Sequence, residues 1–417
     1  MVAASRLCQA PPTFHALRQR AYHVRMTDQF DVVIVGGGLV GMSLAAALQD
    51  SALSVLHIEA QAPVAQAEQW DERHFALGKA SIERLQKIGA WPSSLSGTPI
   101  REVHVSRAGE FGRVLLSAND LGFEAFGATV PARSLVAALE QRLAQCSRVV
   151  RWRPARLLRS TLGASHAELD IQTEQAEQRV RCRLLVAADG TDSAIRSALA
   201  IPEQRVDYRQ TALVCAAQTE RAHGGRAFER FTDDGPIAVL PLSGNRCGVV
   251  CTLDDVSAVA AAALSDTEYL RLLQQRFGHR LGRFERVGRR QPWPLRLMLA
   301  ERLIDQRVVL IGNAAQTIHP IGAQGFNLGL RDADALAGLV SVTDDPGAAD
   351  VLQRYADQRA ADRAQTVRSS DAIVKLSSGR GPLLYGLRAL GMAIIDRVPM
   401  MSKALAMSAM GYREIPR

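Results

Sequence analysis

Three glycines follow an apolar segment in a pattern that can bind phosphate. Residues 30–35 are rich in valine and isoleucine, which predicts a buried strand, and Gly36, Gly38 and Gly41 come directly after it, before an apolar helix over residues 42–48. In such a turn, Gly36 permits the tight bend, Gly38 lets a pyrophosphate reach the backbone, and Gly41 lets the helix pack on the strand. The free N–H groups at the start of the helix would then hold the phosphates.

An acidic residue stands where this kind of turn requires one. A second apolar segment, residues 55–58, ends at Glu59, 18 residues after Gly41. This lies near the roughly 20-residue distance at which a carboxylate hydrogen-bonds the ribose of a bound dinucleotide. The alternative is a glycine turn in an ordinary α/β protein. Because strand, turn, helix, strand and acid occur in order, the dinucleotide site is the favoured interpretation.

Two further buried strands end in loops of small and polar residues. Residues 184–188 lead into Asp189 and Gly190, and residues 307–311 lead into Gly312 and Asn313. Ligands of open α/β sheets bind beyond the carboxyl ends of such strands, so we expect the three loops to meet.

The elements that must position these loops define an α/β fold with two domains. We expect a Rossmann-like nucleotide-binding domain interrupted by a mostly antiparallel β-sheet substrate domain, because the segment from 206 to 252 alternates like strands. Residues 265–268 read as a capping box that opens a helix. The expected division is a disordered extension over 1–25, a nucleotide-binding domain over 26–100, 119–200 and 296–340, a substrate domain over 101–118 and 201–295, and a helical C-terminal region over 341–417.

Composition narrows the class of protein. The chain has 417 residues, 47% of them hydrophobic and 22% charged, with a net charge of +8. It has no apolar run of about 18 residues, which predicts no transmembrane helix. It also has no block rich in lysine and arginine, which argues against nucleic acid as a partner. The six cysteines lack metal-ligand spacing and favour a reducing compartment, with Cys247 and Cys251 as core thiols. No metal site is expected.

The first 25 residues contain four arginines and no acid. This is typical of an organelle transit peptide. The alternative is an extension upstream of a working start at Met26, which is favoured because the folded pattern begins just after that residue.

Together, the three loops resemble the single-component FAD aromatic hydroxylases. The match consists of the glycine turn with Glu59, the Asp189-Gly190-x-x-Ser193-x-x-Arg196 segment, and the loop that begins at Gly312. The resemblance implies that Glu59 and the glycine turn hold the ADP half of FAD, and that Asp189 and its segment contact FAD and NAD(P)H. Asn313 stands where the broad family has an aspartate, which accepts a hydrogen bond from a hydroxyl of the ribityl chain. The amide oxygen of Asn313 can accept the same hydrogen bond. Ala323 replaces a family glycine.

The match narrows to the ubiquinone-biosynthesis branch of this family. Residues 225–241, 103–106 and 319–329 are most similar to the UbiH-type 2-polyprenyl-6-methoxyphenol hydroxylases. This resemblance implies hydroxylation of a polyprenylated phenol, in which reduced FAD reacts with O₂ to a C4a-hydroperoxide that the ring attacks. No catalytic protein residue is required. Hydroxylation at another ring position of the same pathway stays open.

The resemblance also assigns roles to individual residues. Arg73 is expected at the flavin pyrophosphate, while Arg133 is expected either there or in solvent. Pro320 and Gln324 would line the loop beside the flavin, and His319 is expected to be structural. The remaining cofactor-binding residues of the third loop are Gly312, Asn313, Gly325, Phe326 and Asn327.

Partners and rival functions follow from the same resemblance. It implies a polyprenylphenol substrate and transient NAD(P)H. The expected location is the cytoplasm, and a peripheral position on the inner membrane, contact with other ubiquinone-biosynthesis proteins and a homo-oligomer stay open. A flavin-dependent halogenase is disfavoured because the four tryptophans are isolated. A non-catalytic flavin-binding subunit stays open.

The apolar, basic segment 381–412 suits either a membrane surface or packing on its own domain. The charges of 350–374 are expected on a solvated helix face.

Overall fold

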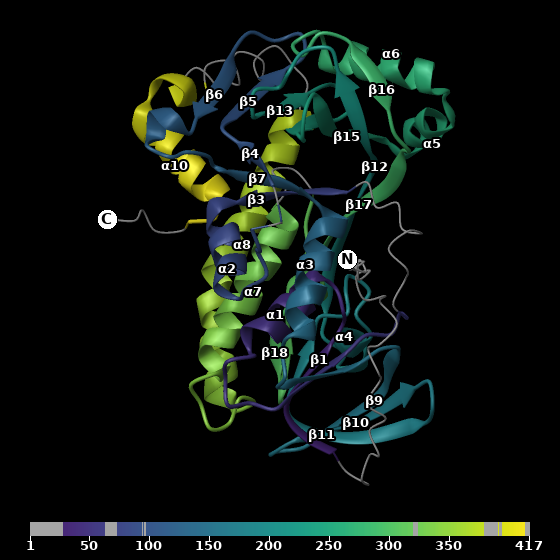
Figure 1. The fold of residues 1–417 in the computed structure, drawn as a ribbon, viewed down its shortest axis with the longest axis vertical. Helices are drawn as coiled ribbons and strands as arrows, with labels where there is room; N and C mark the ends of the chain where they lie inside the picture. The colour runs from purple at the N-terminus through teal and green to yellow at the C-terminus, as the bar shows by residue number, and fades with distance from the viewer. Residues whose placement is uncertain are drawn as a thin grey trace, which may run out of the picture.

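The computed structural model describes residues 28–62, 73–93, 95, 97–319, 324–378, 391 and 394–412. The extension 1–25 therefore lies outside the described residues, as does part of the segment 381–412. The chain forms one sheet at the bottom of the view in Figure 1, a second sheet at the top, and a layer of helices between them. Among the described helices, none is both long enough and apolar enough to cross a membrane.

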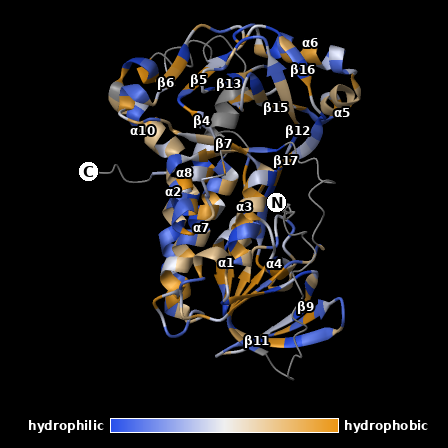
Figure 2. Cartoon of the chain, in the orientation of Figure 1, coloured by the Kyte–Doolittle hydropathy of each residue, from blue (hydrophilic) through white to orange (hydrophobic). Residues whose placement is uncertain are grey.

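The lower sheet is the predicted Rossmann-like sheet. Its neighbouring strands are β18 (Ile304–Asp305), β19 (Val308–Leu310), β11 (Glu177–Ala187), β1 (Asp28–Val35), β2 (Val55–Ile58) and β8 (Val149–Trp152). From β19 to β8 the strands are parallel, while β18 is antiparallel to β19. A hairpin of β9 (Ala155–Leu162) and β10 (Ala167–Thr173) extends β11. The apolar strand cores are visible in Figure 2.

The strand register brings the three predicted loops to one edge. Val35 pairs with both Ile58 and Ala187, and Ala187 pairs with Leu310. These four residues end β1, β2, β11 and β19, so the following residues leave the sheet side by side. This confirms the expectation that the loops share a sheet edge.

Helices cover this sheet and link it to the upper half of the molecule. They are α1 (Leu39–Ala47), α2 (Lys79–Lys87), α3 (Ala132–Ala144), α4 (Ala194–Ala198), α7 (Gln324–Val340) and α8 (Ala349–Ser378). Helix α1 packs on both α7 and α3, and α7 runs beside α8 (Figure 1). A Cβ on Gly329 of α7 would come within 2.6 Å of the Val40 side chain, so this glycine sets the close approach of α7 to α1.

The upper sheet is mixed and mostly antiparallel. Its order is β20 (Gln316–Thr317), β17 (Gln291–Ala300), β12 (Glu203–Thr219), β15 (Arg246–Asp254), β14 (Ile237–Pro241), β13 (Arg226–Phe231), β5 (Glu102–Arg107) and β6 (Arg113–Ser117), with β16 (Phe284–Val287) beside β12. Its outer face packs on α5 (Asp255–Ala263) and α6 (Asp266–Phe277). The capping box of Ser265 and Glu268 is present, and Cys247 and Cys251 are buried, as predicted.

A small sheet lies between the two large ones. It contains β3 (His74–Gly78), β7 (Gly127–Pro131) and β4 (Thr98–Ile100), with β7 in the centre (Figure 1). Mixed sheets and intervening helices confirm the predicted α/β class. The domain boundaries themselves remain our proposal, and β17 crosses the one placed between residues 295 and 296.

Candidate active site

The backbone of the first loop explains each of the three predicted glycines. Gly36 has a φ of +118°, and a Cβ there would lie 2.2 Å from the carbonyl oxygen of Ala188. A Cβ on Gly41 would lie 2.1 Å from the Gly36 oxygen. In contrast, a Cβ on Gly38 would meet no protein atom within 4 Å. Gly36 and Gly41 are therefore needed by the fold, while the space at Gly38 is left for a ligand.

The start of α1 is free to bind an anion. Gly38 is its N-cap, no side chain caps the helix, and no acid stands in its first turn. The first N–H groups of a helix have no partner within the helix, and they carry the positive end of its dipole. The geometry suits a phosphate group beside Gly38.

Glu59 and His57 hold the loop from the neighbouring strand. The Glu59 carboxylate accepts hydrogen bonds from the backbone N–H groups of Gly37, at 2.5 Å, and Gln61, at 2.7 Å. The Nε2 of His57 donates to the Gly36 carbonyl over 3.0 Å. Burial lowers the pKa of His57 to about 4, which keeps the ring neutral. The sequence contained no signal for this role of His57.

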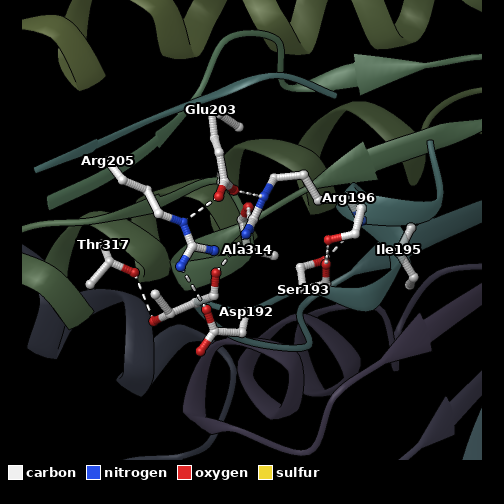
Figure 3. Close-up of polar contacts among 12 residues, drawn as sticks. Asp192, Ser193, Ile195, Arg196, Glu203, Arg205, Ala314 and Thr317 are labelled. Atoms are coloured by element: carbon white, nitrogen blue, oxygen red, sulfur yellow. Dashed lines mark hydrogen bonds and ion pairs between the residues drawn. The ribbon is translucent and has the colours of Figure 1, made fainter. Parts of the chain in front are cut away.

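The second loop is braced by an arginine buried among three carbonyl and carboxylate groups (Figure 3). Arg196 is 1% exposed, donates to the carbonyls of Ala314 at 2.8 Å and Thr191 at 2.7 Å, and pairs with Glu203 at 2.5 Å. The hydroxyls of Thr191 and Thr317 also lie 2.8 Å apart. These contacts join the second loop to the third.

Asp189 has one free carboxylate oxygen at this point. Its Oδ2 accepts from the N–H of Ile195 at 3.3 Å, while the buried Oδ1 has no hydrogen-bond partner among the described residues. A buried acceptor without a donor is costly, so a donor from a ligand would satisfy it.

The third loop is held from behind by an ion network on α7 and α8. Asp332 accepts from the Gly312 N–H at 3.1 Å, from Gln316 Nε2 at 2.6 Å and from Arg359 Nε at 2.7 Å. Arg363 of α8 donates to the Gln316 side-chain oxygen at 3.0 Å. Gln316 therefore supports the loop from inside, and the exposed Asn313 side chain is left on its outer side.

This network corrects the expected solvated face of α8. Arg359 and Asp362 are 5% and 8% exposed, and Arg331 of α7 pairs with Asp362 at 2.7 Å. A charge pattern alone does not separate these residues from the solvated ones on the same helix. Their burial depends on α7 packing alongside, which is a tertiary contact.

The three loops open into a cavity of about 720 Å³ between the glycine turn and the upper sheet. Several of the predicted site residues line it, namely Gly38, Arg73, Asn313, Gly325 and Phe326. The predicted residues that do not line it are Gly36, Gly41, Glu59, Arg133, Asp189, Gly312, Gln324 and Asn327. Gly36, Gly41, Glu59 and Asp189 instead form the loops behind the lining residues.

Three predicted residues, Arg73, Arg133 and Asn327, take individual positions. The guanidinium of Arg73 lies over the Trp293 ring at 4.7 Å from its centroid, whereas Arg133 lines a separate cavity of about 280 Å³. The Asn327 amide donates to the carbonyl of Ala76 at 3.0 Å and accepts from the N–H of Gly78 at 3.1 Å, so it ties α7 to β3.

Of the last two predicted residues, Gln324 is the first residue of α7. The buried side-chain oxygen of Gln324 has no hydrogen-bond partner among the described residues. Pro320 lies outside the described residues.

Residues 29–370 match a family model described as an FAD binding domain. The chain belongs to this family of FAD-dependent monooxygenases. It is 35% identical to ubiquinone hydroxylase UbiL of Rhodospirillum rubrum, over 91% of this chain and 89% of the relative. It is 29% identical to 3-demethoxyubiquinol 3-hydroxylase of Escherichia coli, over 93% of this chain and all of that one. The fold matches p-nitrophenol 4-monooxygenase PnpA of Pseudomonas putida with a TM-score of 0.76 at 16% identity, over 93% and 100% of the two chains.

The loops fit the FAD of this family. The uncapped start of α1 and the open space at Gly38 suit the pyrophosphate, and the unpartnered Oδ1 of Asp189 is an acceptor for a hydroxyl. The start of α7, at Gly325 and Phe326, lines the same cavity. FAD bound here would supply the oxygen chemistry of the monooxygenase.

The upper sheet forms the other wall of the cavity, and this wall is almost entirely apolar. Its lining side chains recur at every second position, as the pleat requires. They include Ala212, Val214, Ala227, Ala238, Leu240 and Val250. Glu229 is the carboxylic acid on this wall of the described cavity, and burial raises its pKa to about 7. The sequence analysis did not identify Glu229 as a site residue. An acid at this position of β13 indicates a functional residue only when the strand pairing shows that the position faces the cavity.

Proposed function

We propose that this monooxygenase hydroxylates the aromatic ring of a polyprenylated phenol in ubiquinone biosynthesis, with 2-polyprenyl-6-methoxyphenol as its substrate. The observation that carries the proposal is the single cavity that runs from the flavin loops to the apolar wall of the upper sheet. A ring that enters along that wall would lie beside the flavin. The names of the relatives, which include a ubiquinone hydroxylase and a demethoxyubiquinol hydroxylase, support the same substrate class.

The residues of this chain would bind the flavin and exclude water. Gly38, Glu59, Asp189 and Asn313 are proposed to hold FAD, while Arg73 would balance the charge of its pyrophosphate. The small and apolar side chains of the sheet wall would hold the ring and keep water from the reacting atoms. NAD(P)H is the proposed reductant, bound transiently.

A second ring position is the alternative. The relative from Escherichia coli is named as a 3-hydroxylase of demethoxyubiquinol. Both substrates share a prenylated ring with oxygen substituents, so the apolar wall alone favours neither.

Complementation separates these two reactions. The chain is expressed in one bacterial strain that lacks 2-polyprenyl-6-methoxyphenol hydroxylase and in another that lacks 3-demethoxyubiquinol 3-hydroxylase. We expect the first strain, and not the second, to make ubiquinone, with the accumulated methoxyphenol consumed in lipid extracts. Rescue of only the second strain would contradict 2-polyprenyl-6-methoxyphenol as the substrate and would favour hydroxylation of demethoxyubiquinol. Failure in both, with flavin-loaded protein present, would favour a non-catalytic subunit.

The Gly38→Val variant is the matched negative control for this experiment. Its side chain would fill the space proposed for the pyrophosphate, and it should fold without restoring ubiquinone in either strain.

A further inference from the structure

Glu229 lies on the cavity wall that the upper sheet forms. It belongs to β13, where its Cα pairs with Ala238 on one side and Val105 on the other. The side chain of the adjacent Phe228 packs in the apolar core with α5 and α6, although Phe228 also borders the cavity. Glu229 lines the cavity on the same face of β13 as Ala227, two positions earlier. Its two cross-strand neighbours are apolar, which makes an acid unexpected here.

The Glu229 carboxylate has no hydrogen bond or ion pair with any other described residue. The neighbouring Arg230 donates instead to the carbonyl of Arg276, at 3.2 Å, and therefore does not neutralise it. Desolvation is the cause of its raised pKa. The other ionisable residues that line the cavity are Arg73, His74, Glu140, Arg153 and His319. Three of these contact each other or another residue: Arg73 lies over Trp293, and Glu140 pairs with Arg153.

Burying an unpaired carboxylate on an apolar wall costs desolvation free energy, and no hydrogen bond from another described residue compensates for that cost. A ligand that brings a hydrogen-bond donor to this wall would remove the cost. An ionised carboxylate is acceptor-only, so the complementary group on the ligand is an O–H or N–H. A phenol supplies one O–H on a flat apolar ring, which matches both the carboxylate and its apolar surroundings.

We propose that Glu229 accepts a hydrogen bond from the ring hydroxyl of the phenol substrate, and thereby fixes which edge of the ring faces the flavin. This inference rests on the proposed function for the class of substrate. A hydrogen bond from a hydroxyl to a carboxylate is among the short and strong ones. It also pushes electron density into the ring, which favours attack by the ring on an electrophilic oxygen.

The contact has a specificity consequence. A site built to bind a hydroxyl rejects an analogue without it, because the buried polar group is then left unpaired. The methyl ether of the same phenol keeps the ring and the prenyl tail but has no proton to donate. The ether should therefore bind at least about tenfold more weakly than the phenol.

Titration of FAD-loaded protein with 2-farnesylphenol and with its methyl ether tests this, with the perturbation of flavin absorbance as the readout. We expect the wild type to prefer the phenol, and Glu229→Gln to lose most of that preference, because the amide replaces a charged acceptor by a neutral one. Glu229→Asp should retain part of it. Glu285→Gln, which changes an exposed acid of the same domain, should match the wild type.

The pH dependence gives a second readout. Glu229 binds the hydroxyl best as a carboxylate, so phenol affinity should rise from about pH 6 to about pH 8 in the wild type, and this rise should be absent in Glu229→Gln. The ether should show no such rise in either protein.

Two results would overturn the inference: an unchanged phenol preference in both Glu229 variants, or no preference in the wild type. Its failure is distinct from failure of the proposed function. If the wild type selects the phenol through Glu229 but never hydroxylates it under turnover, the binding role stands and only the assigned reaction fails.

Discussion

Arg196 donates a hydrogen bond of 2.8 Å to the carbonyl of Ala314, although 118 residues separate them in the chain. The donor lies in α4, directly after the second loop, and the acceptor lies in the third loop (Figure 3). Because Ala314 follows Asn313 directly, this contact fixes the backbone that presents Asn313 to the cavity. The spacing of the motif in the sequence would not reveal this contact, but the geometry makes Arg196 a positioning residue for the flavin site.

Arg196→Ala should therefore weaken flavin retention and destabilise the fold. It leaves Oε2 of Glu203 and two carbonyls without the donor that Arg196 provides, although Arg205 still pairs with Oε1 of Glu203, and the expected cost is about 2–3 kcal/mol in the free energy of unfolding. Flavin content after gel filtration and urea unfolding measure the two effects. Arg205→Gln is the matched control, because Arg205 pairs with the same Glu203 but has a side chain that is 46% exposed. Equal effects of both substitutions would contradict the assigned role of Arg196.

The glycines of the first loop should separate folding from cofactor binding. Gly38→Val adds a side chain where no protein atom lies within 4 Å, so the variant should fold but lose FAD. Gly36→Val would instead meet the Ala188 carbonyl and should not fold. Circular dichroism and released flavin distinguish the two. A Gly38→Val protein that retains FAD would disprove the proposed path of the pyrophosphate.

Glu59→Ala should weaken FAD binding without abolishing it. The substitution removes the acceptor proposed for the ribose, which is worth about 1.5–3 kcal/mol, or roughly tenfold to a hundredfold in affinity. Titration of apoprotein with FAD gives the value. Because Glu59 also accepts from the Gly37 N–H, a matched unfolding curve must show how much of the loss is structural. Unchanged affinity would remove Glu59 from the cofactor site.

The effect of a substitution at Asn313 on FAD affinity should depend on whether the new side chain keeps a hydrogen-bond acceptor. Asn313→Asp keeps a side-chain oxygen and should bind FAD, whereas Asn313→Leu removes it and should bind roughly tenfold more weakly. Asn313 is exposed on the cavity side of its loop, so neither change should affect folding. Normal flavin affinity in the leucine variant would show that this side chain does not contact the ribityl chain.

The sequence predicts the parts of this site that depend on residues close together in the chain, and it does not predict the parts that depend on contacts between distant segments. The strands before Gly36, Asp189 and Gly312 are local patterns, and their shared edge follows from parallel pairing. The support behind them is not local. His57, Arg196 and Asp332 act through contacts that exist only after distant segments have packed, and the burial of Arg359 follows from α7. Glu229 was missed because the face of β13 depends on the register of the whole upper sheet.

Buried histidines should make the fold sensitive to acid. Burial lowers the pKa of His57, His104 and His319 to about 4, below the ordinary value near 6.5. The unfolded chain therefore binds these protons first, and stability present above pH 6.5 should fall as the pH drops toward 4. Each histidine contributes about 1.4 kcal/mol per pH unit within that window.

His104→Phe isolates one of these contributions. A phenyl ring can pack against Phe228 as the imidazole does, with ring centroids 5.6 Å apart. The substitution removes one group that binds a proton on unfolding, so the slope of the unfolding free energy against pH should fall by the contribution of one histidine. His279→Gln, at an exposed position, serves as the control. Identical slopes in wild type and His104→Phe would contradict a neutral, buried His104.

The C-terminal helix α10 (Pro399–Met410) should bind anionic membranes through one face. Ala406, Met407 and Met410 pack on the upper sheet beside β6, while Met400, Met401 and Leu405 are 78%, 42% and 41% exposed. Exposed apolar side chains beside the basic residues Arg397 and Lys403 suit an interfacial helix. Flotation with phosphatidylglycerol vesicles at low salt measures this, and high salt should weaken it.

The double variant Met400→Glu, Leu405→Glu should no longer float. Val256→Glu changes a residue of α5 that is 82% exposed and should float like the wild type. Failure of the wild type to float at low salt would leave the exposed face of α10 as a surface for other proteins.

The central claim is that one cavity holds both FAD and a phenol ring that receives oxygen. The most direct measurement is a single turnover: the FAD-loaded protein is reduced without air, mixed with 2-farnesylphenol, and then exposed to isotopically labelled O₂. We expect a ring-hydroxylated product that carries one labelled oxygen atom. Reoxidation of the flavin with unchanged phenol, and all of the label recovered in hydrogen peroxide, would contradict it.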